Sequence, residues 1–236
     1  MDFTEGEVLY VNKPLHWTSF NVVNRIRWKI RKTLKIKKIK VGHAGTLDPL
    51  ATGVMIICTG KSTKLIENYQ DQTKEYIATL ELGATTPCFD KELPVDATYP
   101  VEHITPELVS KVLPQFVGEI WQTPPVYSAK KVDGKRAYDY ARDGEEVELQ
   151  PKLLVIDEIE VLDFALPVLK IRVVCSKGTY IRALARDIGL ALGSGAHLAA
   201  LERTRIGKIS ITDCMEIDEL IDHIETEMLK NKNIAV

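Results

Sequence analysis

A glycine-rich segment around Asp48 is the first place where this sequence could do chemistry. It reads GHAGTLDPLATG over residues 42–53, with Asp48 directly before Pro49. Glycines let a backbone approach a ligand closely, and a following proline confines Asp48 to extended conformations. A carboxylate held in this way can act as a nucleophile or as a general base. From this loop alone, the simpler explanation is an aspartate that accepts a backbone N–H and caps the next turn.

A second polar segment reads CSKGTYIR and ends at Arg182. It passes through Gly178 from a predicted strand into a predicted helix, whose N-terminus would suit an anion such as an RNA phosphate. On a helical wheel Arg182 falls beside the apolar stripe, so its guanidinium would lie at the rim of the core and could pair with a carboxylate. A surface arginine with a packed stem is the alternative.

Several familiar chemistries have no support in the sequence. Gly60-Lys61-Ser62 resembles the end of a P-loop, but Met55 stands where that motif needs its first glycine. GxSxG, HExxH and GxGxxG motifs do not occur. The four cysteines are far apart, and no histidine cluster completes a zinc site. We therefore expect reduced thiols, no metal and no cofactor.

The elements that must position Asp48 are a helix before it and a strand after it. Thr18 or Ser19 can cap a helix whose apolar positions follow helical spacing. Residues 41–53 are expected to form a loop, and residues 54–58 a short apolar strand.

The remaining elements mix strands and helices without a regular βαβ rhythm. Residues 76–82 alternate as a strand would, and residues 155–162 and 169–175 are also predicted strands. Thr179 is expected to cap a helix with Ile181, Leu184, Ala185, Ile188 and Leu192 in its buried stripe. This mixture predicts an α+β fold.

Residues 213–230 are expected to form an acidic C-terminal helix without chemistry. Positions 213–227 contain no Lys or Arg, and the apolar residues follow helical spacing: Ile217, Leu220, Ile221, Ile224 and Met228. Such a helix would pack on the rest of a single domain spanning residues 1–236.

Charge is distributed unevenly along the chain. The formal net charge is −2, yet residues 8–47 contain ten Lys or Arg and no acid. The densest stretch, Arg25 to Lys40, would attract a phosphate backbone, although a solvated helix face explains it as well. No apolar run is long enough to span a membrane and the N-terminus carries acids instead of a signal peptide, so we expect a cytoplasmic protein.

Taken together, these segments resemble the TruB-type family of tRNA pseudouridine synthases. The resemblance runs from Lys13 to about Lys208. It rests on several motifs in order: KPLHWTS at residues 13–19, GHAGTLDPLATG at 42–53, QTPPVYSAKKVDGKRAYDYARDG at 122–144, GTYIRALARDIG at 178–189 and GAHLAALERTRIG at 195–207. It implies a pseudouridine synthase fold, with a central mixed, largely antiparallel sheet flanked by helices and an RNA-binding cleft.

The resemblance also implies roles for individual residues. Asp48 matches the family's catalytic aspartate, and Arg182 matches the arginine that pairs with it. Tyr76 matches the aromatic residue that stacks on the flipped base and lies near the proton leaving C5. His43 matches a histidine that supports the distorted T loop. Three further residues are expected to bind substrate or shape its site: Tyr180, Leu201 and Lys13.

The implied reaction converts uridine 55 in the T loop of tRNA into pseudouridine. The partner would be the T arm of tRNA, and we expect a monomer. Alternatives remain: a tRNA-binding folding chaperone without catalysis, a synthase acting on other T-loop-like RNAs, or a basic structural module of the ribosome.

The sequence departs from the family pattern at three points. His16 stands where the first motif has glycine, although histidine adopts positive φ less readily. Pro87 and Cys88 interrupt a GxxTDTxD-like segment, and we expect them to affect RNA contacts, not the chemistry. Many relatives continue into a small C-terminal PUA domain, which this chain is expected to lack.

Overall fold

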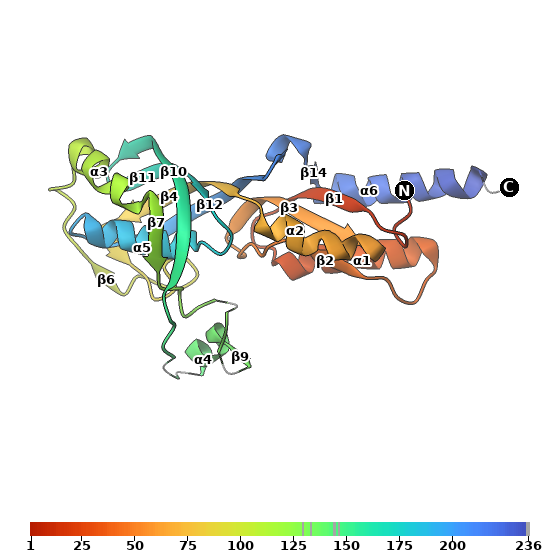
Figure 1. Ribbon diagram of the computed structural model, residues 1–236, viewed down its shortest axis with the longest axis horizontal. Helices are drawn as coiled ribbons and strands as arrows, with labels where there is room; N and C mark the ends of the chain where they lie inside the picture. Colours follow the sequence, from red (N-terminus) through yellow and green to blue (C-terminus); the bar gives the residue numbers. More distant parts are fainter. Residues whose placement is uncertain (129, 133, 144, 146, 235–236) are drawn as a thin grey trace. The chain divides into compact units, whose positions relative to one another are not determined.

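The computed structural model describes residues 1–234 apart from 129, 133, 144 and 146 (Figure 1). The chain divides into two compact units. Unit 1 comprises Met1–Glu75 with Glu202–Val236, and unit 2 is the continuous stretch Tyr76–Leu201. The chain leaves unit 1 within strand β4 (Lys74–Leu82) and re-enters it within strand β12 (Ala196–Ile206).

Unit 1 combines a sheet with two long helices. Besides its parts of β4 and β12, and two 3-10 helices at Gly60–Leu65 and Ile211–Asp213, its elements are β1 (Val8–Lys13), α1 (Ser19–Leu34), β2 (Val41–His43), β3 (Ala51–Thr59), α2 (Ile66–Asp71), β13 (Ile209–Ser210), β14 (Met215–Glu216) and α6 (Ile217–Ile234). The strand order is β14-β1-β3-β12, with β2 on β3 and β13 on β12. β1 runs antiparallel to β3, with Val11 opposite Met55, and β14 runs parallel to β1.

The core of unit 1 lies where α1 and α6 pack together with the sheet (Figure 1). α1 begins as expected at Thr18, whose hydroxyl accepts the Asn21 N–H while the Asn21 side chain caps Thr18 in return. Four of the five predicted apolar positions of the C-terminal helix are buried against this core, and Met228 lies outside the described side chains. The helix itself begins at Ile217, because residues 211–216 form a 3-10 turn and β14 first.

Unit 2 is built on antiparallel strands. Besides a 3-10 helix at Leu113–Phe116, its elements are β5 (Ala84–Thr85), β6 (Ala97–Thr98), α3 (Pro106–Val112), β7 (Gly118–Gln122), β8 (Lys131–Val132), β9 (Lys135–Arg136), α4 (Ala137–Arg142), β10 (Lys152–Ala165), β11 (Val168–Cys175) and α5 (Ile181–Ala191). The strand order is β12-β4-β11-β10-β7, and β10 is antiparallel to both β11 and β7. On β4 the alternation expected from the sequence is confirmed, since every second residue from Lys74 to Leu82 is buried. The sheet is mixed and mostly antiparallel, and helices flank it, which confirms the α+β class.

Two local predictions are wrong. Residues 41–53 are a loop only in their middle, because Val41–His43 pairs with the end of β3 and Ala51 already belongs to β3. Thr179 does not cap α5: its hydroxyl donates to the Ser176 carbonyl, and Tyr180 occupies the N-cap position.

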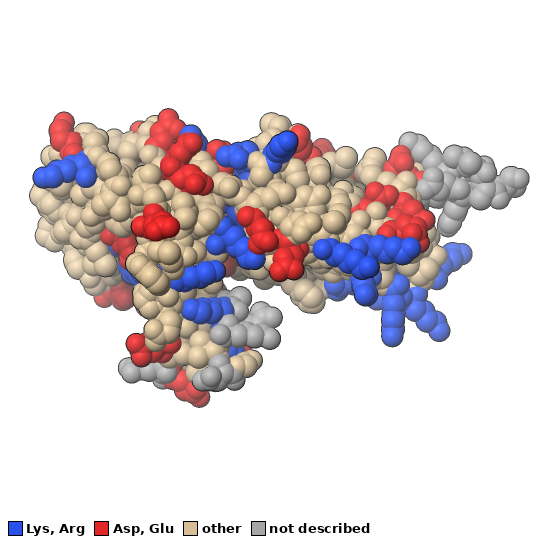
Figure 2. Space-filling view, in the orientation of Figure 1, with Lys and Arg blue, Asp and Glu red and all other residues tan. Residues whose placement is uncertain are grey.

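Lys and Arg side chains gather on one part of unit 1. Figure 2 shows them over α1 and the segment that follows it, up to Lys40. Every basic residue between Arg31 and Lys40 is exposed. No helix among the described residues has the length and apolar character needed to cross a bilayer.

Candidate functional site

Asp48 lies in unit 1, in the short loop between β2 and β3, and is half-buried. The loop is closed by backbone hydrogen bonds, in which Ala44 N–H donates to Ile56 O (2.9 Å) and Ala51 N–H donates to Asp48 O (3.1 Å). The aspartate is therefore presented on a tight turn whose ends are strands, and not on a long flexible loop.

The start of α1 fixes the residues on both sides of Asp48. The buried Ser19 hydroxyl accepts the Leu47 N–H at 2.8 Å and donates to the Leu47 carbonyl at 3.0 Å. On the other side, His16 N–H donates to the Pro49 carbonyl at 2.8 Å. Because both neighbours are bound to one rigid segment, the backbone of Asp48 has little freedom to move.

Arg203 braces the same loop from β12 and is only 1% exposed. Its guanidinium donates to Val54 O (2.8 Å) and Gly45 O (3.1 Å). Gly53 makes this approach possible, because a Cβ built there would lie 2.2 Å from the Arg203 carbonyl oxygen, and its φ is +108°. Sequence reasoning included Arg203 in a family motif without giving it a role.

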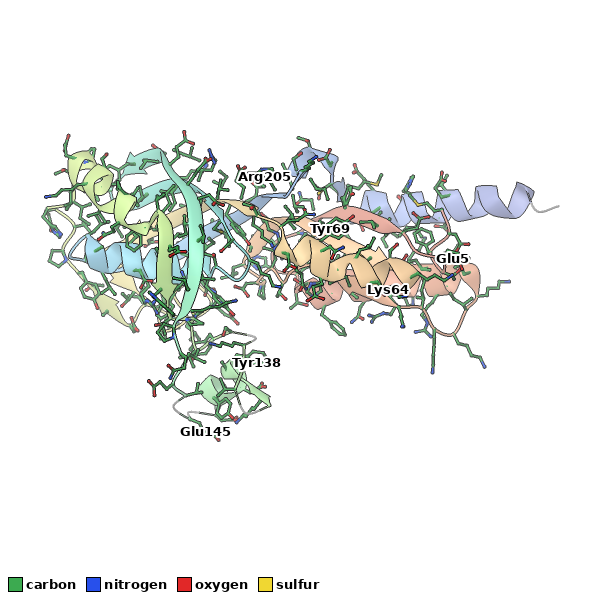
Figure 3. All side chains as sticks on the ribbon, in the orientation of Figure 1. Glu5, Lys64, Tyr69, Tyr138, Glu145 and Arg205 are labelled. Carbon is green, nitrogen blue, oxygen red and sulfur yellow. The ribbon has the colours of Figure 1, made fainter. Side chains whose placement is uncertain are left out.

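The charge of Arg203 has no carboxylate beside it among the described residues. Arg205, farther along β12 and labelled in Figure 3, differs because its Nη2 lies 3.3 Å from Glu75 Oε2. Within the part of the chain that the structure describes, only carbonyl oxygens accept from Arg203. Its positive charge therefore acts on the titratable groups around the loop.

Lys13 is fully buried beside Asp48. Its ammonium donates to Pro14 O (2.9 Å) and Trp17 O (2.6 Å), and so holds the turn that leads into α1. Burial lowers the pKa of Lys13 to about 8; the Asp48 carboxylate opposes this shift and the Arg203 guanidinium adds to it. These contacts describe a positioning role, while direct contact of Lys13 with substrate stays a prediction.

His43 lies on β2 opposite Ile57, within the same unit as Asp48. Burial lowers the pKa of His43, and the Arg203 guanidinium lowers it further. The imidazole is therefore neutral at pH 7. Its Nδ1 is buried, and none of the described residues forms a hydrogen bond with it.

The other predicted site residues belong to unit 2. Tyr76 is a buried residue of β4, and Leu201 is a half-buried residue of β12. Tyr180 caps α5, and the Gln122 side chain binds both of its backbone groups: the Tyr180 N–H donates to Oε1 (2.8 Å), and Nε2 donates to the Tyr180 carbonyl (3.2 Å). Gln122 thereby fixes the start of α5 and the orientation of the arginine that follows.

Arg182 forms a buried ion pair with Asp90. Its Nε lies 3.5 Å from Asp90 Oδ2, and both side chains are nearly inaccessible to solvent. Its two terminal nitrogens donate to Cys88 O (3.0 Å) and Tyr127 O (2.9 Å). Sequence reasoning assigned Asp48 as the partner of Arg182 and missed Asp90. Asp48 belongs to unit 1, so its pairing with Arg182 stays a prediction.

Cys88 contacts this ion pair directly. Its thiol donates to Asp90 Oδ1 at 3.0 Å, and burial, followed by the hydrogen bond to Asp90, raises the pKa of the thiol. Cys88 is fully buried. Cys88 thus helps to orient the carboxylate that holds Arg182, while the expected effect of this departure on RNA contacts stays a prediction.

The predicted site residues thus fall into two groups. Unit 1 brings Lys13 and His43 together around the Asp48 loop, with Arg203 as the shared neighbour. Unit 2 holds Tyr76, Tyr180, Arg182 and Leu201.

Comparison with protein families gives two adjoining matches. Residues 31–181 match the TruB family pseudouridylate synthase (N terminal domain). Residues 182–234 match the tRNA pseudouridylate synthase B C-terminal domain.

Similar curated proteins share one name. The chain is 67% identical over 230 residues to tRNA pseudouridine synthase B of Parabacteroides distasonis, with 98% of each chain covered. It is 50% identical over 217 residues to the protein of the same name from Flavobacterium johnsoniae, with 92% of this chain and 95% of the relative covered.

Two solved structures are similar to this chain over most of its length. One is a Cbf5-Nop10-Gar1 complex, with a TM-score of 0.69 and 31% identity over 93% of this chain and 54% of the other. A second is an H/ACA RNP bound to a substrate RNA containing 2′-deoxyuridine, with a TM-score of 0.66 and 28% identity over 93% of this chain and 53% of the other. The chain thus spans about half the length of these two solved chains.

Proposed function

On the premise that this chain belongs to the TruB family of tRNA pseudouridine synthases, we propose that Asp48 is its catalytic carboxylate and uridine 55 of the T loop its target. The chain has the pseudouridine synthase fold, and it is an isomerase that converts uridine in tRNA to pseudouridine. The observation that carries the assignment to Asp48 is that its loop is held at three points: Ser19 of α1 binds Leu47, the turn before α1 binds Pro49 through His16, and Arg203 binds Gly45.

The reaction needs a group that can act on the sugar or the base without a cofactor. The C1′–N1 bond breaks, the uracil rotates, and C1′ joins C5; the proton on C5 is lost and N1 gains one. A carboxylate can attack carbon or remove a sugar proton, so Asp48 suffices as the reactive group. The rigid loop supports this role, because a fixed nucleophile or base loses little entropy on reaching the substrate.

The other predicted residues would handle the substrate. A uridine inside a folded loop must be flipped out, at a cost of a few kcal/mol that stacking on Tyr76 can offset. The neutral His43 would support the opened T loop. Arg182, held by Asp90, would supply positive charge to the site. The T arm would be the RNA element bound, by a monomeric protein in the cytoplasm.

The basic segment Arg25–Lys40 would bind the phosphate backbone. Seven of its nine Lys and Arg residues are exposed on unit 1, and it carries no acidic residue. Its α1 begins at the residues that hold the Asp48 loop. Phosphate contacts there would set the register of the RNA without reading its sequence.

The test is conversion of an unmodified T-arm stem-loop by wild type and Asp48→Asn, with pseudouridine located by chemical labelling. Wild type should convert the T-loop uridine, and Asp48→Asn should bind the RNA but lose at least about a thousandfold in rate. Asp163→Asn, at an exposed carboxylate of β10, is the matched control and should behave as wild type. Binding without conversion by wild type would favour a chaperone or another RNA substrate instead.

A further inference from the structure

An open hollow of about 470 Å³ lies on the first half of α1 and the turn before it. Its lining consists of His16, Trp17, Asn21, Asn24, Arg25 and Trp28. Apart from Arg25, which belongs to the basic segment, none of their side chains has a role in the function proposed above. Trp28 is 51% exposed, although burial of an indole is strongly favourable in water. An exposed tryptophan in a hollow indicates a surface that a ligand covers.

The lining offers the groups that recognise a nucleotide. Two cations lie over the exposed Trp28 ring, with Arg25 Cζ 5.9 Å and Lys32 Nζ 4.8 Å from the ring centroid, and a stacking base takes the place of one of them. Bases stack on such rings, while neighbouring arginine and lysine bind the phosphate. The hollow therefore combines a stacking platform with a positive rim.

Two amides give the hollow hydrogen-bond donors. Asn21 Oδ1 accepts the Thr18 N–H (2.8 Å), and Asn24 Oδ1 accepts from Arg27 (2.8 Å). These contacts orient both side chains through their oxygens. Neither amide NH₂ donates to any of the described residues, so both donors are available to the acceptor atoms on a base edge.

The hollow adjoins the Asp48 loop. His16, one of its lining residues, donates its N–H to Pro49 O, and Ser19 of the same segment binds Leu47. His16 also has a φ of +66°, a conformation that disfavours residues other than glycine. Strain of this kind is tolerated where the side chain has a use, and here the imidazole forms part of the wall.

We propose that this hollow is a second base-binding subsite, which takes an unpaired nucleotide of the substrate RNA other than the uridine that is isomerised. The base stacks on Trp28, the two asparagine amides meet its edge, and Arg25 meets its phosphate. Charge complementarity favours RNA as the occupant, because α1 and the segment up to Lys40 carry only positive charges. This proposal rests on the proposed function, because the nucleotide bound in the subsite is one of the T loop.

The test combines protein variants with altered RNA. Each unpaired nucleotide of the T-arm stem-loop is replaced in turn by an abasic one, and affinity is measured by fluorescence polarisation. For intact RNA, Trp28→Ala should weaken binding on the order of tenfold. One of the abasic RNAs should bind wild type more weakly than intact RNA does, by a similar factor. Trp28→Ala should bind this abasic RNA and intact RNA equally well, because the same contact is already lost.

Matched controls separate stacking from folding. Phe20 is 62% exposed on the same helix but does not line the hollow, so Phe20→Ala should bind as wild type does. Trp28→Phe keeps an aromatic face and should restore most of the affinity. Equal binding by Trp28→Ala and Phe20→Ala, or additive losses at every abasic position, would overturn the subsite and favour a protein partner for Trp28. Failure of wild type to convert uridine 55 would instead count against the proposed function. The comparison of abasic RNAs between wild type and Trp28→Ala would still test the subsite, because it measures binding and not conversion.

Discussion

At the scale of single residues, the buried ammonium of Lys13 beside the Asp48 loop should make the stability of the protein depend on pH. Lys13 is fully buried, its nitrogen is bound by two backbone carbonyls, and its pKa is lowered to about 8. An unfolded lysine has a pKa near 10.4. Between these two values the unfolded chain holds a proton that the folded protein has lost. In that window, stability contributed by this residue must rise with pH.

The prediction for Lys13 concerns unfolding by urea between pH 7 and pH 11. The free energy of unfolding of wild type relative to Lys13→Met should increase from about pH 8 to about pH 10.4, by at most about 3 kcal/mol. Lys64→Met, at an exposed lysine of unit 1 (Figure 3), should show no such difference. A flat difference for Lys13→Met across the range would show that this lysine keeps its ordinary pKa.

At the scale of elements, two segments far apart in sequence hold one loop. α1 and the turn before it fix Leu47 and Pro49, and β12 reaches Gly45 and Val54 through Arg203. Gly53 permits this because its ideal Cβ would lie 2.2 Å from the Arg203 carbonyl oxygen. The loop therefore depends on close backbone packing as well as on hydrogen bonds.

Gly53→Ala should destabilise the protein by roughly 3 kcal/mol or more, through torsional strain and a backbone clash together. Gly118→Ala is the matched control, since Gly118 has a similar φ of +95° and open space at its Cβ position. It should cost only about 1 kcal/mol from torsion. Urea unfolding of both variants gives the comparison. Equal losses would mean that the approach of β12 to the loop is not tight.

The sequence predicted elements well where the signal was local. Thr18 with Asn21 marks the start of α1, and the alternation along β4 matches its burial. The predictions failed where a side chain or a strand edge formed hydrogen bonds with a partner that the sequence pattern did not indicate. The Thr179 hydroxyl turns back to Ser176 O, so it does not cap α5. Residues at the ends of the 41–53 segment pair as strands because β3 offers an edge to β2.

The candidate site was predictable only in part. Asp48 and Arg182 stand in recognisable motifs, but Asp90 and Arg203 act through contacts that no spacing in the sequence reveals. Arg203 reaches a carbonyl 158 residues earlier. The pairing of Arg182 with Asp90 depends in the same way on how distant parts of unit 2 pack. Such partners require the fold to be known.

At the scale of the whole molecule, charge is segregated along the chain. The net charge is only −2, yet residues 25–40 carry nine Lys or Arg and no acid. α1 nevertheless packs beside the acidic α6, where Lys29 forms an ion pair with Glu225. The lysines beyond α1 remain exposed and can meet phosphate.

Neutralising Lys37 and Lys38 to Gln should weaken binding of the T-arm stem-loop at low salt and make the salt dependence shallower. Each lost phosphate contact reduces the slope of log affinity against log salt by about one. Lys111 and Lys170, exposed on unit 2, give a control variant with the same net charge when changed to Gln. That control should keep the wild-type slope. Parallel slopes for all three proteins would exclude the basic segment from RNA binding.

The reach of Arg203 to Gly45 also affects the order in which the protein can be assembled during its synthesis. Gly45 leaves the ribosome 158 residues before the arginine that braces it. Unit 2 is a continuous stretch and can fold as soon as it emerges, whereas unit 1 must wait for Glu202–Val236. A nascent chain therefore carries Asp48 for most of its synthesis on a loop without its brace. Incomplete translation products would bear the proposed catalytic aspartate on a loop that is not yet rigid.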